Sequence, residues 1–250
     1  ANGYIVSCSY NFQASMITIP EQLDGYTVKG IGDDRNDLFY SEAITAVQFP
    51  SGLQYLGDYA FSENLLSEVI IPVNVDSIGT HVFSYNLLTG LTIPNTVVYV
   101  GDNAFQVNKL STLTLSDNLT IIGDNAFRNN ELISISIPDQ VTLIGRNAFI
   151  YNQLTEFALP SPLPPGAVDW VDGNGNHYDA GATVTDLVTF YKVFIPYTLT
   201  YDDVEMDANG YIISCSYSFE ETDIQIPAIL DGIAVKGIGD NYPYPFYNKG

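Results

Sequence analysis

A period of 22 residues runs through the middle of this chain and limits the folds that it can adopt. Glycine, phenylalanine, asparagine and proline each recur at this step, with one serine in a proline slot. The positions are Gly57, Gly79, Gly101, Gly123 and Gly145; Phe61, Phe83, Phe105, Phe127 and Phe149; Asn64, Asn86, Asn108, Asn130 and Asn152; and Pro50, Pro72, Pro94, Ser116, Pro138 and Pro160. A fixed period of this length is typical of a solenoid, in which each unit forms one coil and stacks on the next.

The segment before each proline has the pattern of a short β-strand. In one unit Leu91 and Ile93 alternate with Thr92, so the two aliphatic side chains should point inward and Thr92 outward. Pro94 then ends the strand, because proline lacks the N–H group that a ladder needs. Each coil is therefore expected to contribute one strand with one buried face.

The second half of each unit is predicted to turn the chain and to fill the coil. Val97 and Val100 form a second inward stretch, and Gly101 follows at a corner, where we expect a positive φ. Phe105 is expected to fill the wide end of the coil. The amide of Asn108 is expected to be buried and bonded to backbone groups of its own and of neighbouring coils.

A longer repeat restarts the chain near its end. The opening ANGYIVSCSYNF recurs as ANGYIISCSYSF from Ala208, and the offset of 207 residues holds through the KGIGD that follows in both copies. We therefore predict a cap over residues 1–43 and the start of a second module over 208–250. Cys8 and Cys215 take the same place in the two copies, so each is expected to be a separate buried thiol rather than half of a disulfide.

The charge of the chain excludes two classes of partner. The chain carries 29 acidic residues against 8 basic ones, a net charge of −21. This charge repels nucleic acids and anionic membranes. No apolar run is long enough to span a bilayer, while 46% apolar and 15% charged residues are typical of a folded chain. We expect neither nucleic-acid binding nor direct membrane insertion.

The repeats resemble a known bacterial family. IPNTVVYVGDNAFQVNKLSTLTL and IPDQVTLIGRNAFIYNQLTEFALP are similar to the IPxxVxxIGxxAFxxCxxL units of BspA-like leucine-rich repeat proteins, with asparagine where that family often has cysteine. The resemblance covers residues 44–160. It implies a mainly β fold, a curved leucine-rich repeat solenoid with one strand per coil on its concave face. It also implies a bacterial protein that is secreted or carried on the cell surface, where members often act as adhesins.

A different composition follows the array. LPSPLPPG is a stiff, proline-rich exit, and apolar residues alternate around DGNGN, which predicts a hairpin. Residues 161–207 are similar to the small β repeats that space bacterial surface proteins such as internalins, with Trp170 and Tyr191 at the matching positions. We expect a small β spacer domain over this stretch.

The sequence contains no catalytic motif that we can identify. It has no G-x-S-x-G elbow, no P-loop and no dinucleotide fingerprint. Its two histidines, His81 and His177, have no zinc-like spacing with the cysteines. His81 takes a slot that holds tyrosine or asparagine in other coils, so we expect it to point to solvent. The chain is therefore predicted not to be an enzyme.

Two acidic stretches offer oxygen ligands at alternate positions, as calcium sites do. They comprise Asp172, Asn174, Asn176 and the nearby Asp179, and Asp203, Glu205, Asp207 and Asn209. Neither has the glutamate at position twelve of an EF-hand loop, and Asn-Gly and Asp-Gly are also the residues that hairpin turns need. Hairpin turns are the main interpretation of both stretches, and weak calcium binding is the alternative. No other cofactor is expected.

The outward positions of the predicted strands form the candidate ligand-binding surface. This surface is rich in small hydroxyl side chains and nearly uncharged, on a strongly acidic protein. Solenoids commonly bind ligands on their concave surface, although threonine and serine also suit any exposed strand. The candidate ligand-binding residues are Glu68, Ile70, Thr92, Thr112, Thr114, Ser134, Ser136 and Glu156.

These observations favour a non-catalytic scaffold, extracellular or on the cell surface, that binds through the concave face of its repeats. The expected partner is a protein or glycan of a host or neighbouring cell. Two alternatives stay open: a purely structural stalk that displays other domains, or an accessory domain of a larger secreted enzyme. The truncated second module is also expected to favour self-association of the chain.

Overall fold

The computed structural model describes side chains over residues 3–7, 15–32, 38–163 and 169–185. Beyond these it describes the backbone of strands between residues 191 and 238. The described residues form strands and turns, and no helix occurs among them. The chain divides into two compact units, Ala1–Pro164 with Asp169–Val193, and Pro165–Val168 with Phe194–Gly250. The stretch predicted as a spacer, 161–207, is thus shared between the two units.

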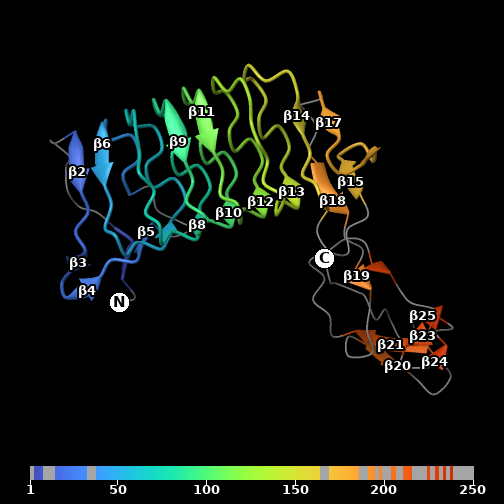
Figure 1. Ribbon diagram of the computed structural model, residues 1–250. Helices are drawn as coiled ribbons and strands as arrows, with labels where there is room; N and C mark the ends of the chain where they lie inside the picture. Colours follow the sequence, from blue (N-terminus) through green and yellow to red (C-terminus); the bar gives the residue numbers. More distant parts are fainter. Residues whose placement is uncertain are drawn as a thin grey trace. The chain divides into compact units, whose positions relative to one another are not determined.

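The first unit is a solenoid with two rows of short strands (Figure 1). One row, which we call the continuous row, comprises β5 (Gly30–Ile31), β7 (Tyr55–Leu56), β8 (Ser77–Ile78), β10 (Tyr99–Val100), β12 (Ile121–Ile122) and β13 (Leu143–Ile144). Each strand pairs in parallel with the next, so that Val100 lies opposite both Ile78 and Ile122. This row confirms the second inward stretch of each repeat.

The other row, which we call the interrupted row, contains the strands that precede the prolines. It comprises β2 (Met16–Thr18), β6 (Ala46–Gln48), β9 (Gly90–Thr92), β11 (Thr112–Thr114) and β14 (Phe157–Ala158), with residues 68–70 and 134–136 between them. β2 pairs with β6, and β9 pairs with β11. The expectation of one strand in every coil is wrong at 68–70 and 134–136. Backbone hydrogen bonds link every coil at the continuous row, at the turns that carry the ladder phenylalanines, and just before the interrupted row, where Leu87 donates to Leu66 and Lys109 to Leu88. Within the interrupted row itself the strand pairing is not continuous.

Strands close the solenoid at both ends of the first unit. β1 (Tyr4–Ile5) lies beside β5, accompanied by the hairpin of β3 (Gln22–Leu23) and β4 (Tyr26–Thr27). At the other end, an antiparallel strand follows the last parallel strand of each row. β18 (Tyr191–Phe194) pairs with β13 of the continuous row, and β17 (Thr183–Val184) pairs with β14 of the interrupted row. β15 (Asp169–Asp172) and β16 (His177–Tyr178) form the predicted hairpin and extend the same sheet.

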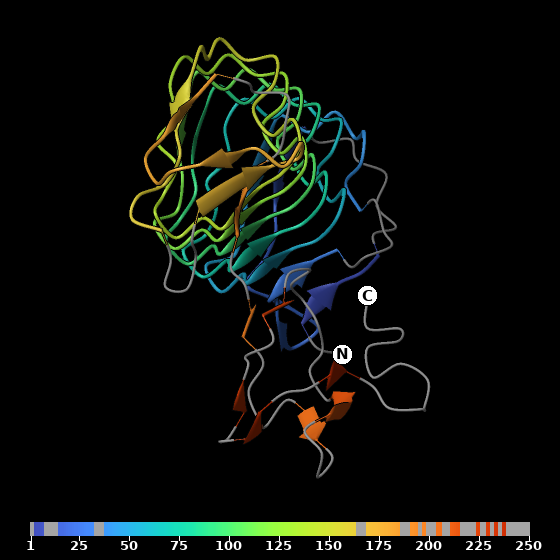
Figure 2. The same cartoon turned by 90° about the vertical axis from the view of Figure 1, so that its right-hand side faces the viewer.

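A ladder of phenylalanines fills the core of the coils, as predicted. Phe61, Phe83, Phe105, Phe127 and Phe149 stack with neighbouring ring centroids 5.5–5.7 Å apart and are almost fully buried. Because each ring packs on the one before and the one after, the core is continuous along the array. Figure 2, in a view turned by 90°, shows the coils stacked one behind another.

A second ladder of buried asparagines joins the coils through hydrogen bonds. Nδ2 of Asn108 donates to the carbonyl of Phe83 in the preceding coil at 2.9 Å and to that of Phe105 at 3.2 Å. Its Oδ1 accepts the backbone N–H of Leu88 at 3.0 Å. Asn64, Asn86, Asn130 and Asn152 bridge coils in the same way. The predicted role of this asparagine is confirmed.

The prediction of a positive φ at the repeat glycines is wrong. A Cβ at Gly123 would lie 2.6 Å from the carbonyl carbon of Gly101, and one at Gly145 would lie 2.4 Å from that of Gly123. Glycine is therefore needed because neighbouring coils approach too closely for any side chain, not because of its φ. The positive φ, 55–58°, occurs two residues later, at Tyr59, His81, Asn103, Asn125 and Asn147.

The second unit repeats the strand pairing of the first cap. β21 (Tyr211–Cys215) pairs with β25 (Gly237–Ile238), and β23 (Ile229–Leu230) with β24 (Ile233–Ala234), in the registers of β1 with β5 and β3 with β4. Two strands from the preceding stretch join this cap: β20 (Val204–Met206) pairs with β21, and β19 (Tyr197–Thr198) with β22 (Ile224–Gln225). Cys215 ends β21, while Cys8 lies outside the described residues.

Candidate functional site

The eight predicted ligand-binding residues all lie exposed along the interrupted row. Those on strands are Thr92, Thr112 and Thr114, and the others lie on stretches of the same row without a strand or beside β14. The aliphatic residues between them are buried or half-buried, as the alternating pattern predicts. The structure thus brings the predicted positions onto one face. That this face is the concave side of the solenoid stays a prediction.

The middle of this face is a patch of hydroxyl groups. Thr114 lies directly opposite Thr92 in the parallel pair of β9 and β11, and Thr112 lies opposite Gly90. A Cβ at Gly90 would lie 2.8 Å from Oγ1 of Thr112, so the hydroxyl of Thr112 occupies the space over the glycine. The hydroxyl groups of Thr92, Thr112 and Thr114 therefore lie on one surface rather than in separate places.

The N-terminal part of the same face is apolar, and Ile70 was the one apolar residue among the predicted ligand-binding positions. Ile70 is 84% exposed, Val73 70% and Met16 68%, the largest exposures among the hydrophobic side chains of the described residues apart from Ile133. Burial of such side chains against a partner stabilises a complex by about 25 cal/mol for each Å² of apolar surface. Apolar contact is therefore available beside the hydroxyl patch.

A groove of about 480 Å³ lies between β6 and the strand-free residues 68–70. We call it the row groove. The lining residues come from both sides of the point where the interrupted row forms no strand. Most of the lining is apolar, and each side contributes one carboxylate. The lining residues are Glu21, Ala46, Val47, Gln48, Phe49, Ser51, Glu68, Val69, Ile70, Pro72 and Val73. Two of the predicted ligand-binding residues, Glu68 and Ile70, thus line this groove.

Phe49 is the residue that distinguishes this part of the array. It stands in a slot that holds an aliphatic residue in later coils, such as Ile71 and Ile93. Its ring packs edge-on against Phe61 at 5.4 Å and reaches Phe83 of the next coil at 6.4 Å. Phe49 is thus the one aromatic residue in this slot of the array, and it lines the row groove.

The charge at the row groove is negative. The N–H of Ser51 donates to Oε1 of Glu21 at 2.8 Å, and this bond holds the pKa of the Glu21 carboxyl below its usual range. Glu68 adds a second carboxyl to the lining, which contains no basic residue. An apolar floor between carboxylates favours a partner that combines an apolar group with a positive charge.

His81 and Ser84 lie close together, but their geometry is structural. Nδ1 of His81 lies 3.2 Å from Oγ of Ser84, which is fully buried and lies 2.8 Å from Oγ of Ser62. A buried hydroxyl cannot reach a substrate, so this pair is no nucleophile and base. The His81 ring stacks on Tyr59 at 4.6 Å and is half-buried rather than free in solvent, which corrects our expectation.

The first predicted calcium stretch is the turn of the β15–β16 hairpin. Oδ1 of Asp172 accepts the N–H groups of Asn174 and Asn176, and Oδ2 accepts the side chains of Asn176 and Tyr178. Burial raises the pKa of the Asp172 carboxyl, but the hydrogen bonds from Asn176, Asn174 and Tyr178 outweigh it and hold the pKa below its usual value. These contacts support the turn interpretation. The described part of the chain contains no group of three acidic, histidine or cysteine side chains placed to hold a metal ion.

Other predicted residues stay in structural roles. Trp170 on β15 is fully buried and its Nε1 lies 3.4 Å from the carbonyl of Pro160, while Tyr191 lies opposite Ile144 in the closing strand β18. His177 contacts Asp169 across the hairpin. Glu205 lies on β20, and the other members of the second acidic stretch lie outside the described residues.

The described part of the chain offers no apolar helix of membrane-spanning length.

Comparison with known proteins agrees with this architecture. A family model described as a BspA type leucine rich repeat region matches residues 35–156 in six copies. Among curated protein sequences, none matches this chain. The solved structure of the pneumococcal vaccine antigen PcpA is similar over 95% of this chain and 63% of its own, with 16% identity and a TM-score of 0.52.

Two further solved structures are similar over 92% of this chain. One is a leucine rich cell surface protein from Faecalibacterium prausnitzii, with 22% identity, 66% of its own chain covered and a TM-score of 0.44. The other is a leucine-rich repeat protein from Bacteroides ovatus, with 16% identity, 72% covered and a TM-score of 0.39. The chain spans about two thirds of the length of PcpA and of the F. prausnitzii protein. Residues 35–156, about half of the chain, are therefore an array of BspA-type leucine-rich repeats.

Proposed function

We propose that this chain is a non-catalytic binding scaffold, secreted or on the bacterial cell surface, and that it binds a protein or glycan through its interrupted row. The observation that carries the proposal is the row itself. It presents an apolar groove with acidic edges beside a patch of hydroxyl groups, on coils whose interior is fixed by buried ladders. Rigid placement of the exposed groups lowers the entropy cost of binding.

The two parts of the row favour different contacts with one partner. Ile70 and Val73 at the row groove supply apolar surface, which contributes most of the energy in protein interfaces. The hydroxyl groups of Thr92 and Thr114 both donate and accept hydrogen bonds, so they suit peptide backbone or sugar hydroxyls. The BspA-type repeats support a place outside the cytoplasm. A host or neighbouring-cell protein is the partner that we favour.

The test is a binding screen on arrays of extracellular-matrix proteins and glycans. It compares the native chain with Thr92→Lys/Thr114→Lys/Ser136→Lys and with Ile70→Lys. The matched control is Leu65→Lys/Leu87→Lys/Gln153→Lys, which adds the same three charges at exposed positions off the row. We expect the two row variants to lose at least tenfold in affinity and the control to bind like the native chain. Binding that survives both row variants, with folding intact, would contradict the proposal.

A structural stalk is the second candidate, and one observation favours it. The second unit repeats the strand register of the first cap at an offset of 207 residues, which suits a string of modules. In that case none of the variants in the screen would change any interaction, because the native chain itself would bind nothing. The screen therefore separates the two candidates.

A further inference from the structure

The row groove is built from residues that depart from the repeat. Phe49 replaces the isoleucine or leucine of the later coils. Ile70 stands where those coils have threonine, serine or alanine, and Val73 where they have asparagine, aspartate or serine. Each departure introduces a larger apolar side chain, and all three side chains line the row groove. Three changes in different slots of the repeat thus converge on one site.

The apolar side chains at the row groove are accessible to a partner. Ile70 is 84% exposed and Val73 70%, and Phe49 is half-buried although its aliphatic counterparts in the later coils are buried. The volume of about 480 Å³ lies within the range of about 300–1,000 Å³ that is usual for small ligand sites, so a whole apolar side chain fits. Its burial would remove the apolar surface of Ile70 and Val73 from water and stabilise a complex.

The backbone beside the row groove has unused hydrogen-bonding groups. No N–H or C=O group of residues 68–70 is hydrogen-bonded within the described part of the chain, because the interrupted row forms no strand there. The groove lies between these residues and β6. An extended peptide brings one N–H and one C=O group with each residue, so its main chain suits this place.

The charge of the site selects among peptides. Glu21 and Glu68 flank the apolar lining, which contains no basic residue. The net charge of −21 attracts cationic segments to the chain and disfavours a second copy of this acidic chain as the occupant. The complementary peptide therefore carries positive charge on both sides of its apolar group.

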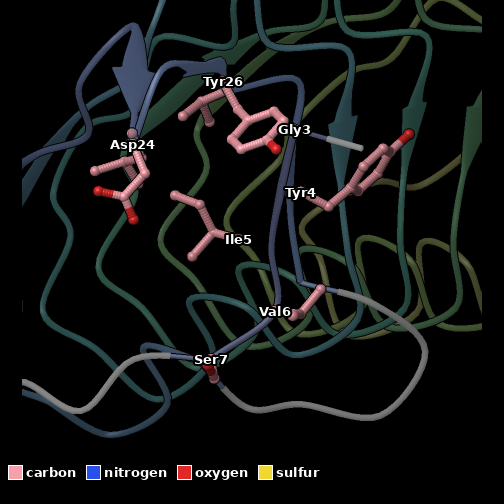
Figure 3. A pocket seen from close by; sticks show the side chains of 9 residues that line it. Gly3, Tyr4, Ile5, Val6, Ser7, Asp24 and Tyr26 are labelled. Carbon is pink, nitrogen blue, oxygen red and sulfur yellow. The ribbon is translucent and has the colours of Figure 1, made fainter. Parts of the chain in front are cut away.

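A groove in the first cap does not offer this combination. It has a volume of about 290 Å³ and is lined by residues 3–7 together with Leu23, Asp24, Tyr26 and Val28. Figure 3 shows Ile5, Asp24 and Tyr26 gathered around it. Asp24 is the one carboxylate of this lining, so a peptide with two basic side chains is matched at the row groove and not in the cap.

We propose that the row groove binds an extended peptide segment of a partner protein in which an aromatic or large aliphatic side chain has a basic side chain on either side. In an extended peptide, side chains two residues apart point to the same side, so the order basic–x–apolar–x–basic directs all three to the groove. The apolar group packs on Phe49, Ile70 and Val73. The basic groups pair with Glu21 and Glu68, and arginine is favoured because it can bond a carboxylate through two N–H groups. This inference rests on the proposed function and names the chemistry of the partner.

The test uses a short, fluorescently labelled synthetic peptide with phenylalanine at its centre, arginine two places to either side and glycine elsewhere. One control peptide has glutamate in place of both arginines, and another has serine in place of the phenylalanine. Fluorescence anisotropy measures the affinity of each peptide for the native chain. We expect both control peptides to bind at least tenfold more weakly, and the affinity of the arginine peptide to fall as added salt screens its charges.

Variants of the chain locate the site. Glu21→Gln/Glu68→Gln removes both charges and keeps a side-chain oxygen at each position, so the bond from the neighbouring backbone N–H can persist. This variant should bind the arginine peptide at least tenfold more weakly, with a flatter salt dependence. The matched control, Glu63→Gln/Glu131→Gln, removes two exposed carboxylates that do not line the row groove. This control and Asp24→Asn in the cap should bind like the native chain.

Three results would overturn the inference. One is equal binding of the arginine and glutamate peptides, and another is an equal loss in the groove variant and in its matched control, which would show that the overall charge alone attracts the peptide. The third is that the native chain does not bind the arginine peptide. In that case a partner found in the array screen and lost in Thr92→Lys/Thr114→Lys/Ser136→Lys would still support the proposed function, so the two proposals fail separately.

Discussion

The two strand rows of the solenoid are built from the same repeats but under different constraints. In the continuous row every coil pairs with the next, and each glycine contacts the backbone of the preceding coil. In the interrupted row two stretches form no strand, and the exposed side chains change from Glu68 and Ile70 to threonine and then serine. One row therefore pairs without a break from coil to coil, and the other varies its exposed side chains.

This difference teaches which part of a repeat is available for function. Positions that stack on their own copies, such as Phe105 and Asn108, tolerate little change, because a substitution affects the preceding coil and the next. Thr92 and Thr114, by contrast, lie opposite each other in the pair of β9 and β11, on the exposed face of that pair. A surface for binding can therefore change along the interrupted row while the interior stays constant.

The largest effect is expected from removing one member of the asparagine ladder. Asn108→Ala leaves the N–H of Leu88 buried without its acceptor. It also removes one of the two amide donors from each of the carbonyl groups of Phe83 and Phe105, which keep their bonds from Asn86 and Asn130. The orphaned donor costs about 1–3 kcal/mol and each lost bond about 1 kcal/mol, so we expect a loss of roughly 3–4 kcal/mol in the free energy of unfolding, measured by urea denaturation. Asn118→Ala is the control, because that amide makes an exposed bond and should cost less than about 1 kcal/mol. Equal losses would contradict the comparison.

The next effect contrasts a glycine from each row. A Cβ at Gly123 would lie 2.6 Å from backbone atoms of Gly101 and Asp102, and the coils would have to separate. We expect Gly123→Ala to lower the free energy of unfolding by about 2–3 kcal/mol. At Gly90 the Cβ would meet only the hydroxyl of Thr112, which can rotate away. Gly90→Ala should change stability by less than about 0.5 kcal/mol, and a larger cost at Gly90 than at Gly123 would reverse our assignment of the rows.

His81 should make stability depend weakly on pH. Burial lowers the pKa of its ring below the ordinary value of 6.5, and the nearby Asp102 and Asp58 oppose this only in part. The unfolded chain therefore binds a proton at a higher pH than the folded chain, and stability falls as pH drops below about 6.5. His81→Asn, which restores the residue of later coils, should remove this part of the loss between pH 7 and pH 5. The free energy of unfolding is measured by urea denaturation at each pH. An equal loss between pH 7 and pH 5 in both proteins would refute the role of His81.

The smallest effect on stability is expected on the interrupted row. Thr92→Lys/Thr114→Lys/Ser136→Lys changes exposed side chains only, so the free energy of unfolding should shift by less than about 1 kcal/mol. Thermal denaturation followed by circular dichroism measures this directly. A loss comparable to that of Asn108→Ala would mean that the row holds the coils together and is no independent binding surface.

Calcium is expected to have no effect on the β15–β16 hairpin. Both carboxyl oxygens of Asp172 already accept hydrogen bonds from the turn, and a calcium ion would have to replace them. The melting temperature should therefore be the same with 2 mM calcium, in the range where extracellular sites bind, as with a chelator. A rise of several degrees that Asp172→Asn abolishes would establish the weak calcium site instead.

The sequence was most informative where residues repeat. Phe105 and Asn108 recur because each copy contacts the next, so the period alone predicted the core and the hydrogen-bonded ladder. Gly101 was placed at the right corner for the wrong reason, because a close approach between coils leaves no separate mark in the sequence. The asparagines at 103, 125 and 147 were the available sign of the positive φ, since asparagine tolerates that conformation better than most residues.

The candidate site was predicted only in part. Alternation gave the exposed residues of the interrupted row, but not the break at residues 68–70, which depends on whether neighbouring coils pair. The row groove is lined by Phe49, the one aromatic residue in its slot, but that residue alone does not predict a groove. The closing strands β17 and β18 come from the predicted spacer, and no pattern within 161–207 tells whether such a strand pairs with its own hairpin or with the last coil.

The most direct test of the account is native-state hydrogen exchange of the free protein, because it compares the two rows without a ligand. The amides of Gly101, Gly123 and Gly145 donate along the continuous row at 2.7–2.8 Å, whereas residues 68–70 and 134–136 lie in no strand. We predict that the glycine amides exchange roughly a thousandfold or more slowly than those of residues 69, 70, 135 and 136. Equal protection of both groups would contradict the division of the coil into a structural row and a variable row.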